Sequence, residues 1–211
     1  KNTNSLSNVH IEPFDKSKYD RGINLIGNIR GDNGLGQSTR LIADIIDKSE
    51  IPFTINNFFV PPGGSMTDKS YDYKITDMAS YGVNVIHVNA SEFTLCYMEY
   101  GNKLWDYRYN IAYWLWELEE FPEEWLNNIN LVDEIWTPAE FISNTLRKYT
   151  DKPVTTVPYC VTAPTDDKYD RKYFNLPEDK FLFLMMFASG SIMERKNPLG
   201  TIEAFKKAFD K

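Results

Sequence analysis

A glycine-rich loop at residues 31–36, with the sequence GDNGLG, is the first segment whose residue types suit ligand binding. It lies between an apolar run and a stretch with helical spacing, where glycines such as Gly34 and Gly36 let the backbone turn sharply. A ligand can then approach the N–H groups at the positive end of the following helix. The alternative is a tight strand-to-helix turn that binds nothing. We favour ligand binding and expect Gly36 to lack a side chain for function rather than for folding.

The loop does not match two common nucleotide-binding motifs. A dinucleotide-binding loop needs a third glycine where Thr39 stands, and an acidic residue after the second strand, where Asn56 and Asn57 stand. The P-loop pattern, GxxxxGK followed by Ser or Thr, does not occur. A nicotinamide-dependent dehydrogenase is therefore strongly disfavoured.

A second candidate is the aromatic and acidic segment at residues 113–122, YWLWELEEFP, which follows a predicted strand. Ligands of doubly wound sheets bind outside the carboxyl ends of strands, where Trp116 could pack on a sugar ring and Glu117 could accept hydrogen bonds from its hydroxyls. The alternative is that Trp114 and Trp116 are core residues and the glutamates begin a solvated helix. The cluster as a whole favours a site.

His87 and Asn89 stand at the end of another apolar run, VNVIHV at residues 83–88. A lone histidine on a strand is more often a structural residue than a functional one. Its place at the carboxyl end of a strand keeps the functional interpretation open.

A basic pair, Arg195 and Lys196, precedes the last predicted helix, which starts at Asn197 and Pro198. Cations at the positive end of a helix are unfavourable by roughly 0.3 to 1 kcal/mol each. The pair therefore suits a bound anion, and the alternative is an exposed basic turn.

The elements that would position these residues alternate between strands and helices. Apolar runs predict strands at residues 23–29, 53–58, 83–88, 109–116, 132–136 and 153–159, and spacing predicts helices at 36–48 and within 91–102. A proposed capping box of Thr137, Pro138 and Glu140 predicts a further helix through Tyr149. Continuous rather than alternating apolar strands indicate an α/β fold, a doubly wound Rossmann-like parallel sheet covered on both faces.

The predicted domain organisation has four parts. A polar lead at residues 1–20 precedes the first domain at 21–161, and a linker at 162–180 leads to an apolar strand, 181–187, and a helix. These last two elements, within 181–211, are expected to begin a truncated second domain. Because an isolated apolar strand exposes unpaired backbone, residues 180–209 are expected either to dock on the first domain or to pair with the same element of another chain, and self-association is the more specific expectation.

Composition excludes several classes of function. The chain has 211 residues, 42% of them hydrophobic, and a net charge of -7, so a nucleic-acid partner is not expected. Its apolar runs are far shorter than the roughly 20 residues of a membrane span. Cys96 and Cys160 make no disulfide framework, which indicates a cytoplasmic location, and His10 and His87 are too far apart to predict a metal site.

Four segments together resemble the retaining glycosyltransferases of family 4, which have the GT-B fold of two facing Rossmann-like domains. They occupy residues 22–46, 109–125, 131–161 and 181–209. The resemblance implies transfer of a sugar from a nucleotide-sugar donor to a carbohydrate acceptor, with retention of configuration and without a metal or other cofactor. A mannose-like donor in polysaccharide assembly is the family-level expectation.

The resemblance also implies roles for particular residues. Gly34 and Gly36 match the family's glycine loop, and Lys196 matches its lysine before the helix, so these residues would bind the donor and its diphosphate. Ser191 stands where the family has an arginine, and Arg195 is the candidate substitute.

On the acceptor side, many members of the family have a histidine after the strand predicted here at residues 109–116. This chain has no histidine there, and Trp116 and Glu117 occupy that part of the sequence. These two residues, with His87 and Asn89, are the acceptor-side candidates. The family's paired glutamates would lie beyond Lys211, so the catalytic residues are not assigned and the chain is expected to be an incomplete, inactive fragment. The alternative function is a non-catalytic Rossmann-like module that binds a carbohydrate or a nucleotide.

Overall fold

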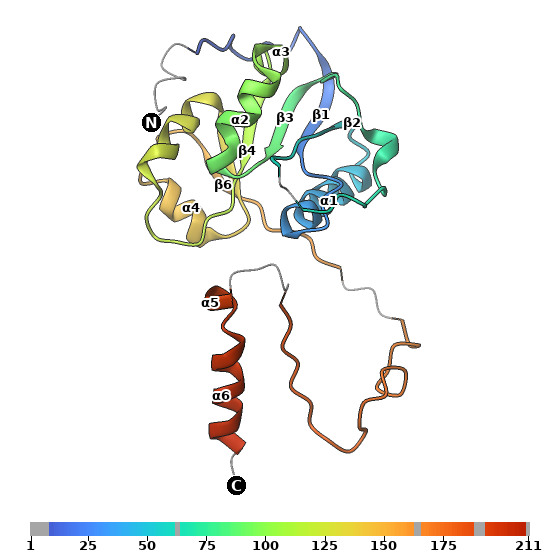
Figure 1. Ribbon diagram of the computed structural model, residues 1–211. Helices are drawn as coiled ribbons and strands as arrows, with labels where there is room; N and C mark the ends of the chain where they lie inside the picture. Colours follow the sequence, from blue (N-terminus) through green and yellow to red (C-terminus); the bar gives the residue numbers. More distant parts are fainter. Residues whose placement is uncertain (1–8, 62–63, 163–165, 188–192, 210–211) are drawn as a thin grey trace. The chain divides into compact units, whose positions relative to one another are not determined.

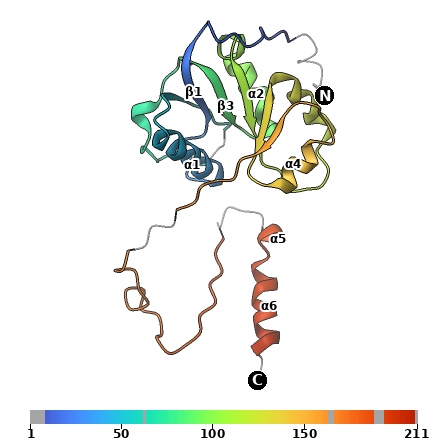
Figure 2. The ribbon, with the colours of Figure 1, turned by 180° about the vertical axis from the view of Figure 1, so that it is seen from behind.

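The computed structural model describes residues 9–61, 64–162, 166–187 and 193–209, and the chain divides into two compact units, Lys1–Thr162 and Ala163–Lys211. The first unit contains a six-stranded parallel sheet with the strand order β2-β1-β3-β4-β5-β6 (Figures 1 and 2). The strands are β1 (Asp20–Gly27), β2 (Phe53–Asn57), β3 (Tyr81–His87), β4 (Tyr109–Tyr113), β5 (Glu134–Thr137) and β6 (Val154–Thr156). The predicted α/β class with a Rossmann-like parallel sheet is confirmed.

Helices follow the strands in the predicted alternation. They are α1 (Gly34–Lys48), α2 (Ala90–Tyr100), α3 (Asn102–Trp105) and α4 (Glu140–Leu146), with 3-10 turns η1 (Asp72–Lys74) and η2 (Glu123–Leu131). Leu25 and Ile26, neighbours on β1, are both fully buried but belong to different apolar clusters. Leu25 shares its cluster with Ile42 of α1, whereas Ile26 shares its cluster with Phe93 of α2. Strand β1 is therefore buried on both faces, as the continuous apolar runs predict.

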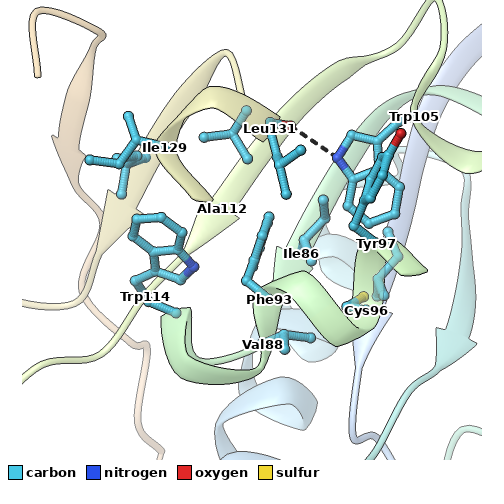
Figure 3. Packing of buried hydrophobic residues seen from close by; sticks show 14 of the residues in the cluster. Ile86, Val88, Phe93, Cys96, Tyr97, Trp105, Ala112, Trp114, Ile129 and Leu131 are labelled. Atoms are coloured by element: carbon cyan, nitrogen blue, oxygen red, sulfur yellow. Dashed lines mark hydrogen bonds between the residues drawn. The ribbon is translucent and has the colours of Figure 1, made fainter. Parts of the chain in front are cut away.

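Aromatic rings fill the cluster on the α2 side of the sheet (Figure 3). Phe93 meets Trp114 and Trp105 edge-on, at ring-centroid distances of 5.4 and 6.3 Å. The indole Nε1 of Trp105 donates a 2.9 Å hydrogen bond to the carbonyl oxygen of Leu131. Trp114 is thus a core residue, which confirms the structural alternative for this position.

A ladder of buried asparagines crosses the middle of the sheet. Asn24, Asn84 and Asn110 are paired in register on β1, β3 and β4. Asn24 Nδ2 donates to Asn84 Oδ1 at 2.9 Å, and Asn84 Nδ2 donates to Asn110 Oδ1 at 2.8 Å. Sequence analysis did not identify this network, which satisfies side chains that would otherwise be costly to bury.

The predicted capping box at the start of α4 is wrong. Helix α4 begins at Glu140, preceded by Ala139, and it ends at Leu146 rather than at the predicted Tyr149. The Thr137 hydroxyl donates to the carbonyl oxygen of Ala139 instead of accepting from a helix N–H. Thr137 is the last residue of β5, so its backbone belongs to the sheet and the helix starts later.

The second unit contains α5 (Met193–Lys196) and α6 (Pro198–Phe209). The Asn197 side chain accepts a 3.2 Å hydrogen bond from Gly200 N, which confirms the predicted start of the last helix. The strand predicted at residues 181–187 is wrong, because this segment forms no ladder among the described residues. A strand requires a paired neighbour, and an apolar run alone does not supply one.

Candidate functional site

The carboxyl ends of β1 and β3 mark the point where the order of the sheet reverses. From β1 the chain passes to β2 on one side and then returns to β3 on the other. Ligands of open α/β sheets bind in the crevice at such a switch point. The glycine loop follows β1, and His87 ends β3, so the tertiary structure brings these two predicted features to one edge (Figure 1).

The two candidate glycines of the loop differ in their surroundings. A Cβ atom at Gly36 would lie 2.0 Å from the backbone oxygen of Gly31, whereas one at Gly34 would have open space around it in the part of the chain that the structure describes. Asn33 caps α1, and its side chain accepts a 2.9 Å hydrogen bond from Gly36 N. The expectation that Gly36 lacks a side chain for function is wrong, since close backbone packing requires a glycine there. Gly34 is the glycine with open space beside it.

His87 is held by hydrogen bonds at both ring nitrogens. Nδ1 lies 3.1 Å from the carbonyl oxygen of Tyr113. Nε2 lies 2.6 Å from the Ser38 hydroxyl and 3.2 Å from the Tyr159 hydroxyl. Since a carbonyl oxygen only accepts, Nδ1 carries the proton and Nε2 accepts from a hydroxyl. Burial lowers the pKa of His87 to about 4, so the ring is neutral at pH 7.

A cavity of about 80 Å³ opens beside this network, at the ends of three strands. Its lining consists of Asn28, Asn33, Leu35, Phe58, Phe59, Val60, His87, Val88 and Glu92. Asn28, Phe58 and Val88 are the first residues after β1, β2 and β3, whose last residues are paired in register. Because the three strands are parallel, these residues lie together at the carboxyl-terminal ends of the strands.

The lining residues of this cavity that have polar side chains are Asn28, Asn33, His87 and Glu92. Asn28 is only 8% exposed, and its Oδ1 is buried with no hydrogen-bond partner among the described residues. Glu92 lies in the first turn of α2, and partial burial raises the pKa of its carboxyl group. Asn89, a predicted candidate, precedes α2, and its side chain makes no capping hydrogen bond among the described residues.

The other acceptor-side candidates follow β4. This strand ends at Tyr113, three residues before the predicted end at Trp116, because the next residue turns into the aromatic core. Trp116 is half-buried, donates a 2.7 Å hydrogen bond from Nε1 to the oxygen of Glu120, and packs edge-on against Trp125. Glu117 is exposed. Neither Trp116 nor Glu117 is among the lining residues of the cavity.

The basic pair lies in the second unit. Arg195 and Lys196 are exposed residues in the last turn of α5, and α6 begins at Pro198. This placement agrees with the predicted position directly before the last helix. Ser191, which stands where the family has an arginine, lies outside the described residues.

Sequence analysis missed Asn28, Glu92 and Ser38. Asn28 lies inside the strand predicted at residues 23–29 and became a residue after the strand only in the structure, where β1 ends at Gly27. Nothing local distinguishes Glu92 or Ser38. Within the described ranges, no group of three or more His, Cys, Asp or Glu side chains could hold a metal ion. In the same part of the chain, no helix is long and apolar enough to span a bilayer.

Comparisons of the chain with models of protein families, with curated proteins and with solved structures found no match. The family assignment therefore remains a hypothesis that rests on the sequence motifs, beside a fold that the structure establishes as Rossmann-like.

Proposed function

We propose that this chain is the acceptor-side part of a retaining glycosyltransferase that moves a sugar from a nucleotide-sugar donor to a carbohydrate acceptor. One observation carries the proposal beyond the motifs. Gly34 begins the 15-residue helix α1 at the switch point, and a Cβ atom added there would have open space around it among the described residues. The start of a helix stabilises negative charge, so the exposed N–H groups there suit a donor phosphate.

Chemistry of this kind depends on stabilising the departing diphosphate. In the first unit, the backbone N–H groups of Gly34 and Leu35 have no intrahelical partner, as at the start of any α-helix. In the second unit, Lys196 and Arg195 are the proposed diphosphate ligands, because a dianion would make cations beside a helix start favourable. The proposal requires no metal or other cofactor.

Isothermal titration calorimetry with UDP, GDP, ADP and their hexose derivatives tests the proposal. We expect at least one of these compounds to bind, and Gly34→Ala to weaken that binding at least tenfold, because the added methyl group fills the open space. The unfolding temperature of this variant should stay close to that of the parent chain. Unchanged affinity in Gly34→Ala, or no binding of any of these compounds, would contradict the proposal.

A non-catalytic binding module is the second candidate, and the state of His87 favours it. Both ring nitrogens of His87 are hydrogen-bonded, and its pKa of about 4 makes it a poor base at neutral pH. Release of nucleoside diphosphate from a nucleotide sugar by this chain, in the presence of an acceptor glycan, would support the transferase and contradict the module. Absence of turnover fits both candidates, because the chain itself is expected to be inactive.

A further inference from the structure

We propose that a second cavity, at the amino ends of the strands, binds a small aromatic compound that carries a carboxylate. This cavity has a volume of about 550 Å³, and its lining includes Asp20, Gly82 and Tyr109, the first or second residues of β1, β3 and β4. The candidate site described above lies at the carboxyl ends of the strands. The inference therefore concerns a separate site and does not depend on the proposed function.

The second cavity lies on the α1 side of the sheet, which few helices cover. Ile111 lines it and belongs to the same apolar cluster as Ile42 of α1. Among the described residues, α1 is the only α-helix with residues in this cluster, whereas α2, α3 and α4 all contribute to the cluster on the other side. The α1 side of β4 and β5 therefore has room for a ligand of the size that such cavities usually bind.

One carboxylate holds two aromatic walls of the second cavity in place. The Tyr109 hydroxyl donates a 3.1 Å hydrogen bond to Glu134 Oε2, and Trp136 Nε1 donates a 2.8 Å hydrogen bond to Glu134 Oε1. The rings of Tyr109 and Trp136 both line the cavity and are only half-buried. Because these rings are already fixed, little side-chain freedom is lost when a ligand packs on them.

Phe14 and Tyr19 form the other aromatic walls. Phe14 is 46% exposed and meets Tyr109 edge-on, at a ring-centroid distance of 5.7 Å. The guanidinium carbon of Arg108 lies 3.7 Å from the centroid of the Tyr19 ring. Four aromatic rings with fixed neighbours favour a planar aromatic ligand, which can stack on one ring and meet another edge-on.

The charged residues of the lining favour an anion. Lys16 and Arg21 are exposed, and neither forms an ion pair with another described residue. Asp20 is the only acidic lining residue, so the cavity has an excess of positive charge in a chain whose net charge is -7. An aromatic cation would suit the rings but would face Lys16 and Arg21. A carboxylate can accept charge-assisted hydrogen bonds from both.

NMR titration of the 211-residue chain tests the site with three probes of similar shape, naphthalene-2-carboxylate, neutral 2-naphthamide and 2-naphthylmethylammonium. We expect submillimolar binding of the carboxylate, at least tenfold tighter than that of the ammonium compound, with the amide between them. The indole N–H signal of Trp136 should shift, whereas that of the fully buried Trp105 should not. Absence of binding, or equal affinities for the three probes, would overturn the inference.

Replacement of the two cations tests the anionic part of the ligand. Lys16→Gln combined with Arg21→Gln should lower the affinity for the carboxylate at least tenfold and leave that for the amide nearly unchanged. Both side chains are exposed, so the fold should be retained. The matched control is Lys18→Gln, an exposed lysine of the same segment that does not line the cavity. Unchanged carboxylate affinity in the double variant would contradict the assignment.

Val83→Phe tests the location, because Val83 lines the cavity and a larger side chain there fills it. This variant should lose binding of all three probes while its circular dichroism spectrum matches that of the parent chain. Binding that persists in the folded variant would place the probes on another surface, such as the exposed apolar residues 181–187, and would refute the cavity assignment. If Val83→Phe does not fold, the double variant of Lys16 and Arg21 decides.

Discussion

His87 shows how burial decides the role of a single residue. Its position at the end of a strand made it a candidate for acceptor binding, and the same position gives it hydrogen bonds to three other segments. Ser38 belongs to α1, Tyr113 ends β4, and Tyr159 follows β6. This arrangement stabilises the neutral imidazole. His87 therefore lines the crevice and does not exchange protons with a ligand.

We expect the free energy of unfolding to fall by roughly 3 kcal/mol as the pH decreases from about 6.5 to about 4, through His87 alone. Its folded pKa of about 4 lies below the ordinary value of 6.5, so the unfolded chain binds the extra proton in this range. Stability therefore rises with pH across it and levels off above. Urea denaturation at several pH values measures the effect.

The comparison variants for this experiment are His87→Gln and His10→Gln. The His87 variant should be less stable at pH 7 but should lose this part of the pH dependence. His10 has a highly exposed side chain, and its replacement should leave the profile as it is. An identical pH dependence in His87→Gln and the parent chain would rule out the assignment.

At the scale of elements, backbone packing shapes the turn between β1 and α1, and side-chain hydrogen bonds join neighbouring strands of the sheet. The turn brings Gly36 against Gly31, and it leaves Gly34 beside open space. The asparagine ladder links β1, β3 and β4, three neighbouring strands of the sheet. Both features act before any ligand is present.

Gly36→Ala should destabilise the chain by roughly 1 to 3 kcal/mol, because a methyl group 2.0 Å from the Gly31 oxygen forces the backbone apart. Gly34→Ala should change stability by no more than about 0.5 kcal/mol, since its methyl group would lie in open space among the described residues. Chemical denaturation of the two variants side by side measures the difference. Equal stability would mean that the turn relaxes freely.

Asn84→Ala should destabilise the first unit by roughly 3 kcal/mol, because it leaves the buried Asn110 Oδ1 and the Leu104 oxygen without their Asn84 donor. Asn127→Ala, at an exposed position on η2, is the matched control and should change stability by less than about 0.5 kcal/mol. The denaturation midpoints decide the matter, and similar midpoints for both variants would show that the ladder adds nothing to stability.

At the scale of the whole molecule, the chain combines a unit with a layered core and a unit whose apolar residues remain exposed. In the second unit, Phe181, Leu184 and Met186 are each at least 80% exposed. Rings of Phe183, Phe205 and Phe209 contact one another, but residues 181–187 form no strand pair among the described residues. Exposed apolar side chains beside unpaired backbone favour association.

We therefore expect the 211-residue chain to self-associate through residues 180–209 at high micromolar concentration. Light scattering should give a mass above that of the monomer for this chain, and a monomer mass for a version that ends at Val161. Leu184→Glu should shift the full chain toward the monomer, because it places a charge on the exposed apolar segment. Monomer masses for both chain lengths would show that this element is not an association site.

Local sequence patterns by themselves determined the order and type of most elements in the first unit. Apolar runs predicted all six strands, and continuous rather than alternating runs predicted burial on both faces, because these properties depend on neighbouring residues. The pattern failed where an apolar run had another cause. Trp114 extends the run of β4 because it belongs to the aromatic core, and residues 181–187 lack the partners that a strand needs.

Only the tertiary structure decided which residues form the candidate site. Asn28 and Glu92 are distant in sequence and line one cavity because β1 and β3 are parallel neighbours whose carboxyl ends lie side by side. The contrast between Gly34 and Gly36 depends on where the Gly31 backbone lies, and the asparagine ladder depends on strand register. These contacts join segments that are distant in sequence, and a local pattern of apolar residues contains no information about them. The sequence alone therefore predicted the sheet but not the cavity at the carboxyl ends of its strands.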